Sequence, residues 1–243
     1  MKAAVAEQVV VVTGAGTGIG RAVALALGRQ GATLALVGRR PAPLESVAAV
    51  ARGVGGQARA YPTDLERDDE IGDLAGVLQR DFGHVDILVH SAAIVRPGTV
   101  ADAPGKDFDL HYRINLLGPY LLTQVLLPMI RARQGQIVFI NSSVGLTARA
   151  RVGQYAATKH ALKAIADSLR EEVNRDGVRV LSVYPGRTAT PAQEALHALE
   201  GRPYRPDRLL QPEDVATMVL SALCLPRTAE VTDIQIRPMV KPD

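Results

Sequence analysis

Cysteine is almost absent: Cys224 is the only one among the 243 residues. A single cysteine can form no intrachain disulfide and has no cysteine companions for a zinc site, so we expect no metal centre. Because Cys224 lies in the apolar run MVLSALCLP, we expect a small buried hydrophobic side chain rather than a reactive thiol.

The chain also lacks a block of lysine and arginine, although its net charge is +3 and its pI about 9.2. We therefore expect no nucleic-acid partner. The longest apolar stretch, NLLGPYLLTQVLLPMI, is broken by prolines and a glutamine and is shorter than the roughly 20 residues of a spanning helix. Glu7 and Gln8 interrupt the apolar start, which argues against a signal peptide. We expect a cytoplasmic protein with no membrane partner.

No repeat, linker or low-complexity segment divides the chain; instead, short β-branched runs alternate with longer amphipathic ones. Fully apolar strands between helices predict a parallel sheet covered on both faces. We expect one α/β domain over residues 1–243, with a cofactor half at about 1–135 and a catalytic and substrate half at about 136–243. The expected strands are residues 8–14, 33–38, 58–64, 85–93, 136–143, 178–186 and 231–236. The expected helices are residues 19–30, 44–52, 67–82, 107–131, 152–175 and 212–224.

Two segments disturb this alternation. Gly118-Pro119 predicts a bend in the helix 107–131. The piece EGRPYRPDRLLQP, residues 200–212, is rich in proline and arginine. It is either a surface connection or a mobile loop over a site.

The first strand leads into a glycine-rich turn, TGAGTGIG, that opens the first helix. Gly14, Gly18 and Gly20 permit a tight turn and a close approach of backbone to a ligand. The helix start near Thr17 and Ile19 directs N–H groups and a positive dipole end at that place, which suits a pyrophosphate. This context favours a dinucleotide site over a plain strand–helix turn.

No acidic residue follows the second strand. A site for NAD normally has a carboxylate there for the ribose 2′-hydroxyl, but this chain has Gly38, Arg39 and Arg40. Guanidinium groups offer forked hydrogen bonds to a 2′-phosphate. We therefore expect NADP(H), with NAD as the alternative; Thr17 adds no second basic residue inside the turn.

The stretch QYAATKHAL predicts helix and sets Tyr155 and Lys159 one turn apart on the same face. Tyrosine ordinarily ionises near pH 10. A nearby ammonium group favours the phenolate, so we expect Lys159 to lower the pKa of Tyr155. Tyr155 is then a candidate acid in reduction and base in oxidation.

Taken together, the motifs resemble those of the short-chain dehydrogenase/reductase family, of the common single-domain branch, over nearly the whole chain. TGAGTGIG resembles the family's glycine motif, and Tyr155 and Lys159 resemble its catalytic pair. Ser142 stands thirteen residues before Tyr155, at the family's common spacing. Asn115 in RINLLGP, Asp64 in PTDLE and the segment YPGRTAT resemble further family positions. The segment HSAA, His90 to Ala93, departs from the family's usual N-N-A-G.

The resemblance implies a Rossmann-type, doubly wound, seven-stranded parallel sheet and hydride transfer between NADP(H) and a carbonyl or secondary alcohol. Ser142 would bind the substrate oxygen, Lys159 the nicotinamide ribose, and Asn115 a proton-relaying water. The cofactor-binding positions it implies beyond the glycine turn and the arginines are Asp64, Leu65, His90, Ala92, Pro185, Gly186, Thr188 and Thr190. For His90 we expect a structural hydrogen bond rather than an acid–base role; Asp64 could instead cap the following helix, and Asn115 could cap the bend.

Three other functions remain open. One is an NAD-dependent dehydrogenase, another a 3-oxoacyl-(acyl-carrier-protein) reductase, and the third a catalytically silent NADP-binding regulator. A halide-ejecting lyase of the same fold is disfavoured by Lys159 and the glycines.

The substrate pocket is expected from residues 92–98, 148–151 and 193–211, where Arg96, Arg149, Arg151 or Arg202 could meet an anionic substrate. The resemblance also implies a homotetramer or dimer through the helices 107–131 and 152–175.

Overall fold

A computed structural model describes residues 5–240 of the chain. One parallel sheet runs in the order β3-β2-β1-β4-β5-β6-β7. Its strands are β1 (Val9–Thr13), β2 (Thr33–Gly38), β3 (Gln57–Pro62), β4 (Ile87–His90), β5 (Gln136–Ile140), β6 (Arg179–Pro185) and β7 (Asp233–Ile236). The order reverses between β1 and β4, so the predicted doubly wound seven-stranded sheet is confirmed. The ends of the expected 1–243 domain, residues 1–4 and 241–243, lie outside the described residues.

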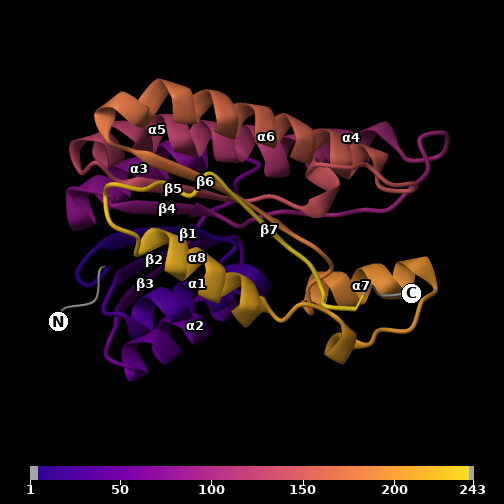
Figure 1. The fold of residues 1–243 in the computed structure, drawn as a ribbon, viewed down its shortest axis with the longest axis horizontal. Coiled ribbons are helices and arrows are strands. Elements are labelled where there is room, and N and C mark those ends of the chain that lie inside the picture. The colour runs from indigo at the N-terminus through magenta and orange to yellow at the C-terminus, as the bar shows by residue number, and fades with distance from the viewer. Residues whose placement is uncertain (1–4, 241–243) are drawn as a thin grey trace.

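Helices cover both faces of the sheet (Figure 1). The helices are α1 (Gly18–Arg29), α2 (Pro41–Gly53), α3 (Asp68–Phe82), α4 (Gly105–Tyr112), α5 (Gly118–Ala132), α6 (Gly153–Val173), α7 (Pro191–Glu200) and α8 (Pro212–Leu223). In the figure α1, α2 and α8 lie below the sheet, and α3, α5 and α6 lie above it.

Each face of the sheet has its own hydrophobic core, and β1 serves both. Val10 and Val12 pack with α1 and α8, whereas Val11 packs with α3, α5 and α6. Successive side chains of a strand point to opposite faces, so a strand covered on both must be apolar throughout. All five residues of β1 are buried, which explains its unbroken run of valines.

The expected long helix 107–131 is interrupted one turn earlier than predicted. Residues Arg113–Leu117 form a π-helical turn between α4 and α5. Pro119 has no N–H to donate to the carbonyl of Asn115, four residues back, so the regular α-helical bond cannot form there. A Cβ on Gly118 would lie 2.7 Å from the carbonyl oxygen of Leu65, so the backbones approach closely at this point.

Two expectations about the last third of the chain are corrected. Residues 191–200, for which no helix was predicted, form α7, and Thr190 caps it by accepting a hydrogen bond from the N–H of Gln193 at 3.1 Å. Cys224 is exposed, not buried, because α8 directs Val215, Val219 and Leu223 inward and ends at Leu223, which leaves Cys224 just beyond the helix.

Among residues 5–240, no helix combines the length and apolar character needed to cross a bilayer. The same residues contain no group of three or more histidine, cysteine, aspartate or glutamate side chains arranged to hold a metal ion.

Candidate active site

A cavity of about 430 Å³ opens at the carboxyl ends of the strands, at the edge where doubly wound sheets bind ligands. Sixteen of the residues expected at the site line it: Gly14, Thr17, Gly18, Ile19, Gly20, Arg39, Arg40, Asp64, Leu65, Ala92, Ser142, Tyr155, Pro185, Gly186, Thr188 and Thr190. Three others, His90, Asn115 and Lys159, do not line the cavity; they are almost fully buried.

Backbone forms the wall of the cavity at the glycine turn. Gly14 has φ +65°, and a Cβ there would lie 2.9 Å from the Cα of Ala92. A Cβ on Gly20 would lie 2.4 Å from the carbonyl oxygen of Gly14. No side chain caps the N-terminus of α1, and its first turn carries no acidic residue. This end of the cavity therefore suits an anion such as a pyrophosphate.

Arg39 and Arg40 directly follow β2 and border the cavity, and both are exposed. Among residues 5–240, neither forms an ion pair that would neutralise it. Asp64 is not the N-cap of α3, because α3 begins at Asp68 with Arg67 as the cap residue. Its carboxylate instead accepts a hydrogen bond from the N–H of Glu66 at 3.1 Å. This end of the cavity has the basic groups that a phosphate would meet.

At the other end of the cavity, Tyr155 and Ser142 both line the wall. Burial raises the pKa of Tyr155 to about 12, although the Ser142 hydrogen bond acts to lower it. The chain's own groups thus do not produce the lowered pKa expected from the Tyr155–Lys159 spacing. Any such lowering needs further positive charge beside the phenol.

Lys159 lies one helical turn from Tyr155 and is 1% exposed. Its Nζ is 5.8 Å from the centre of the Tyr155 ring and donates a hydrogen bond to the carbonyl of Ile140 at 3.1 Å. Burial lowers the pKa of Lys159 to about 8. A group with that pKa can gain or lose a proton near neutral pH.

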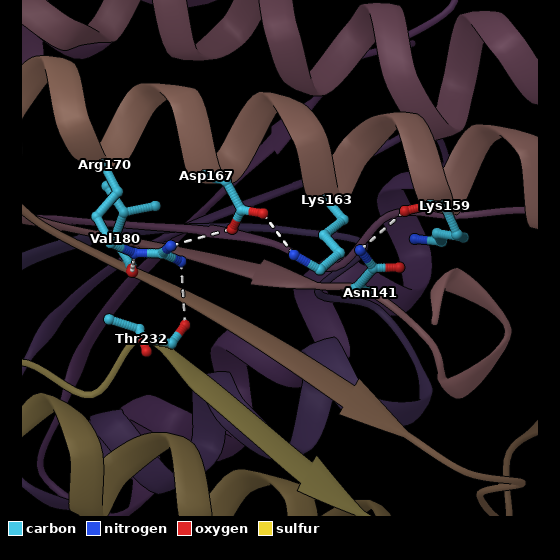
Figure 2. Close-up of polar contacts among 7 residues, drawn as sticks. All are labelled: Asn141, Lys159, Lys163, Asp167, Arg170, Val180 and Thr232. Atoms are coloured by element: carbon cyan, nitrogen blue, oxygen red, sulfur yellow. Dashed lines mark hydrogen bonds and ion pairs between the residues drawn. The ribbon is translucent and has the colours of Figure 1, made fainter. Parts of the chain in front are cut away.

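The helix that carries Tyr155 and Lys159 is fastened along its length (Figure 2). Asn141 donates its Nδ2 hydrogen to the carbonyl of Lys159 at 3.0 Å. Two turns further on, Asp167 accepts hydrogen bonds from Lys163 and Arg170. Arg170 also donates to the backbone carbonyls of Val180 and Thr232. The contacts with Asn141, Val180 and Thr232 tie α6 to the ends of β5, β6 and β7, whereas those of Asp167 lie within the helix.

Asn115 lies in the π-helical turn and is fully buried. Its Oδ1 accepts the N–H of Ile94 at 2.8 Å, and its Nδ2 donates to the Ile94 carbonyl at 3.0 Å. Nδ2 also lies 3.4 Å from the Oγ1 of Thr158 on α6. Asn115 therefore joins the loop after β4 to α6 rather than simply capping a bend.

His90 is buried, stacks on Phe139 and shares a hydrogen bond of 2.9 Å with Thr123. Burial, followed by the nearby charge of Lys159, lowers the pKa of His90 to about 3. A neutral ring behind the cavity wall fits the structural role expected for His90 and not an acid–base one.

Two polar residues that sequence reasoning missed hold the site together. Thr13, at the end of β1, accepts hydrogen bonds from the N–H groups of Ser91 and Ala92 at 3.0 and 3.1 Å. Asn141 accepts the N–H of Ser142 at 2.9 Å and holds α6 as described. Each is a polar residue closing an apolar strand, and that position was the available signal.

Side chains form the walls at the end of the cavity beside Tyr155, which we call the substrate end. Ile94, Val95, Arg149, Gln193 and Leu196 line it. Arg187 and Glu200 also line it, and they form a two-pronged ion pair at 2.9 and 3.1 Å that joins the loop after β6 to the end of α7.

The four arginines suggested for an anionic substrate lie in different settings. Arg96 pairs with Asp107, and Arg202 lies 3.9 Å from the carboxylate of Glu200. Only Arg149 of the four lines the cavity; Arg151, in the same loop, does not.

Comparisons with known proteins show the family and the fold of this chain. The sequence model of a family described as short chain dehydrogenase matches residues 8–200. An uncharacterized oxidoreductase of Staphylococcus aureus is 32% identical over 234 residues, covering 96% of this chain and 98% of the relative.

Two solved structures have a similar fold. An alcohol dehydrogenase from the archaeon Thermococcus sibiricus, complexed with 5-hydroxy-NADP, superposes with a TM-score of 0.89 at 26% identity, covering 98% of this chain and 99% of that one. An actinorhodin polyketide ketoreductase with NADPH gives a TM-score of 0.88 at 26% identity, covering 95% of each chain.

Proposed function

The chain belongs to the short-chain dehydrogenase family, and on that premise we propose that it transfers a hydride between NADP(H) and a carbonyl or secondary-alcohol substrate. The observation that carries this proposal is that Tyr155 and Ser142 line the same cavity, with the buried Lys159 one helical turn from Tyr155 and its Nζ 5.8 Å from the centre of the phenol ring. This is the arrangement that proton transfer at a substrate oxygen requires.

Three side chains divide the work at the substrate oxygen. Ser142 donates a hydrogen bond to that oxygen and stabilises the charge that develops on it. Tyr155 gives a proton to the oxygen in reduction and removes it in oxidation. When bound, the nicotinamide supplies or accepts the hydride, and its oxidised ring adds positive charge near the phenol. Lys159 binds the ribose hydroxyls and favours the ionised phenol while it is charged.

Buried groups carry the proton onward. Asn115 holds the loop after β4 against α6 close to Lys159, and in this proposal it anchors a water between Lys159 and solvent.

Other residues hold the cofactor. His90 keeps the segment Ser91–Ala92 in place along the end of the cavity that would receive the adenosine. Pro185, Gly186, Thr188 and Thr190 contact the carboxamide end.

NADP is proposed over NAD because of Arg39 and Arg40. Both border the cavity where the adenosine ribose of a bound dinucleotide would lie, and no carboxylate stands at the end of β2 to repel a 2′-phosphate. The two solved relatives named above were both determined with forms of NADP. NADH used in preference to NADPH would overturn this part.

The test is steady-state oxidation of NADPH and NADH over a panel of ketones, aldehydes and 3-oxoacyl thioesters, with Tyr155→Phe run beside the parent. Turnover that prefers NADPH and disappears in the variant supports the proposal. Tight NADPH binding without turnover over a broad panel would favour the silent regulator.

A 3-oxoacyl thioester is a second candidate substrate, because Arg149 borders the cavity in residues 5–240 without an ion-pair partner. A free guanidinium at the mouth suits an anionic carrier. Arg149→Ala should raise KM for such a thioester and leave KM for a neutral ketone unchanged. Arg151→Ala, in the same loop, is the matched control.

We also propose a homo-oligomer, a tetramer or dimer, through α4, α5 and α6. Phe108, Tyr112, Tyr120 and Val125 expose large apolar side chains on α4 and α5. Light scattering coupled to size-exclusion chromatography tests this; a monomer at micromolar concentration would contradict it.

A further inference from the structure

One side of the helical segment after residue 105 holds the neighbouring loop by hydrogen bonds. Asp107, His111 and Asn115 are spaced four apart, so they follow one another along one side. The Asp107 carboxylate accepts a hydrogen bond from the Arg96 guanidinium at 2.5 Å. The Nε2 of His111 accepts the backbone N–H of Arg96 at 3.0 Å. With the Asn115 bonds to Ile94, this makes three successive tethers to residues 94–98, which we call the wall loop.

The wall loop forms part of the substrate end of the cavity. Ile94 and Val95 line the cavity. On the far side, the N–H of Gly98 donates to the Arg151 carbonyl at 2.8 Å. The loop therefore lies between α4 and the segment that leads into α6, and its position sets the space beside Tyr155.

His111 is one of the two fully buried tethers, with Asn115, and has no role in the chemistry proposed above. Its side chain is 0% exposed, and its ring centre lies 6.2 Å from that of Tyr155. A backbone N–H can only donate, so Nε2 must be unprotonated for the bond to Arg96 to exist. A second proton on the ring would set two donors against each other at 3.0 Å.

The groups around His111 keep it neutral. Burial lowers its pKa most; Asp107 on α4 acts against this, and Arg96 on the wall loop adds to the lowering. From α6 the facing group is the Tyr155 ring. The pH must therefore fall below the ordinary histidine pKa of about 6.5 before the ring becomes charged.

We propose that His111 is a positioning residue of the substrate end: its neutral ring fixes the wall loop beside Tyr155, and protonation of the ring releases that wall. The consequence for turnover rests on the proposed function, whereas the tether itself does not. Acid then opens the substrate end while the cofactor end stays intact.

The experiment compares the parent with His111→Gln, whose amide oxygen can accept the same bond without titrating, and with His111→Leu, which cannot accept it. Amide hydrogen exchange of Arg96, corrected for intrinsic rates, is measured from pH 7.5 to 5.5 without substrate. The parent should lose about tenfold protection as the pH falls, the glutamine variant should keep it, and the leucine variant should lack it throughout. His160→Gln, a histidine on α6 bonded to the Ala156 carbonyl, is the control and should follow the parent.

Kinetics on the best substrate then tests positioning. We expect an acid limb in kcat/KM for the parent and its absence in His111→Gln. In His111→Leu, KM should rise about tenfold at pH 7.5 with little change in kcat.

Equal acid dependence of Arg96 exchange in the parent and the glutamine variant would refute the tether. Altered exchange with unchanged kinetics would refute the positioning role. Should the leucine variant not fold, the glutamine variant decides alone. If the protein turns over no substrate, the proposed function is wrong. The exchange experiment still tests whether the hydrogen bond from Arg96 to His111 holds the wall loop.

Discussion

The two ends of the cavity are built from different material. At the glycine turn the wall is backbone, and a Cβ on Gly20 would reach within 2.4 Å of a carbonyl oxygen. At the substrate end the wall is made of side chains and is held by other side chains, such as Asn115 on Ile94 and Arg187 on Glu200. The glycine-turn end depends on the absence of side-chain atoms, and the substrate end depends on which side chains are present.

This difference bears on how readily each end can change. A backbone wall allows few alternatives, because every added atom collides. A side-chain wall can be rebuilt one residue at a time without disturbing the sheet. We therefore expect cofactor binding to depend on the first end and substrate choice on the second.

The largest effect should come from removing the reacting proton while both walls stay intact. Tyr155→Phe deletes only the phenol oxygen, and kcat should fall about a thousandfold, within the usual range for acid–base catalysis. Cofactor affinity, measured by fluorescence titration, should stay within about twofold of the parent. Tyr112→Phe, at an exposed position on α4, serves as the control; equal losses in the two variants would contradict the assignment.

Next in size is damage to the backbone wall. Gly20→Ala should weaken cofactor binding about a hundredfold, because the carbonyl of Gly14 must move away from the new methyl group. Isothermal titration measures this. Gly72→Ala is the matched control: α3 leaves open space around Gly72, so the change should leave binding unaltered and stabilise the fold by about 0.5–1 kcal/mol.

Arg39 sharpens the comparison, because here a side chain rather than backbone selects the ligand at the cofactor end. Arg39→Asp should weaken NADPH binding by about tenfold or more through loss of a charge-assisted bond and gain of a repelling charge. NADH binding should change little and is the internal control. Intact NADPH affinity would show that Arg39 does not read the phosphate.

The smallest effect concerns stability. Lys159 is buried with its pKa lowered to about 8, so the folded state is penalised below that pH and the penalty fades as pH rises toward the ordinary lysine value of about 10.4. Lys159→Met should therefore raise the free energy of unfolding at pH 7 by about 1–2 kcal/mol, or the Tm by a few degrees, while abolishing turnover.

Thermal unfolding of both proteins between pH 7 and 10 measures this gain, which should shrink as the pH rises. Lys163→Met removes a partly exposed lysine paired with Asp167 and should give no gain. A Lys159→Met protein less stable than the parent at pH 7 would show that the Ile140 hydrogen bond outweighs desolvation.

Sequence reasoning found the sheet because its signal is local and repeated. Within a dozen residues, the valines of β1 indicate a buried strand and the glycines after it indicate a tight backbone turn. The same reasoning placed the helix break at Gly118-Pro119, whereas the π-helical turn falls at Arg113–Leu117. Pro119 causes the interruption, but the hydrogen bond that it cannot donate would have gone to the carbonyl of Asn115, four residues earlier.

The substrate end resisted prediction because its contacts join residues far apart in the sequence. Nothing near His111 indicates that it meets the backbone of Arg96, and nothing near Arg187 points to Glu200. Likewise α7 is a short helix just before the proline-rich segment 200–212, and its cap by Thr190 is evident only once the chain is folded. Cys224 was misjudged because an apolar run does not say at which residue its helix leaves the core.

The π-helical turn between α4 and α5 sets the rotation of α5 about the helix axis relative to α4. One extra residue in a turn rotates everything that follows by about 100°, so α4 presents His111 to the wall loop while α5 presents Leu122, Leu126 and Ile130 to the sheet. Deleting any one residue of Arg113–Leu117 would rotate α5 relative to α4 and turn one set of contacts away. The length of this segment is therefore under as much constraint as its composition, and gaps in it should be far rarer among relatives than substitutions.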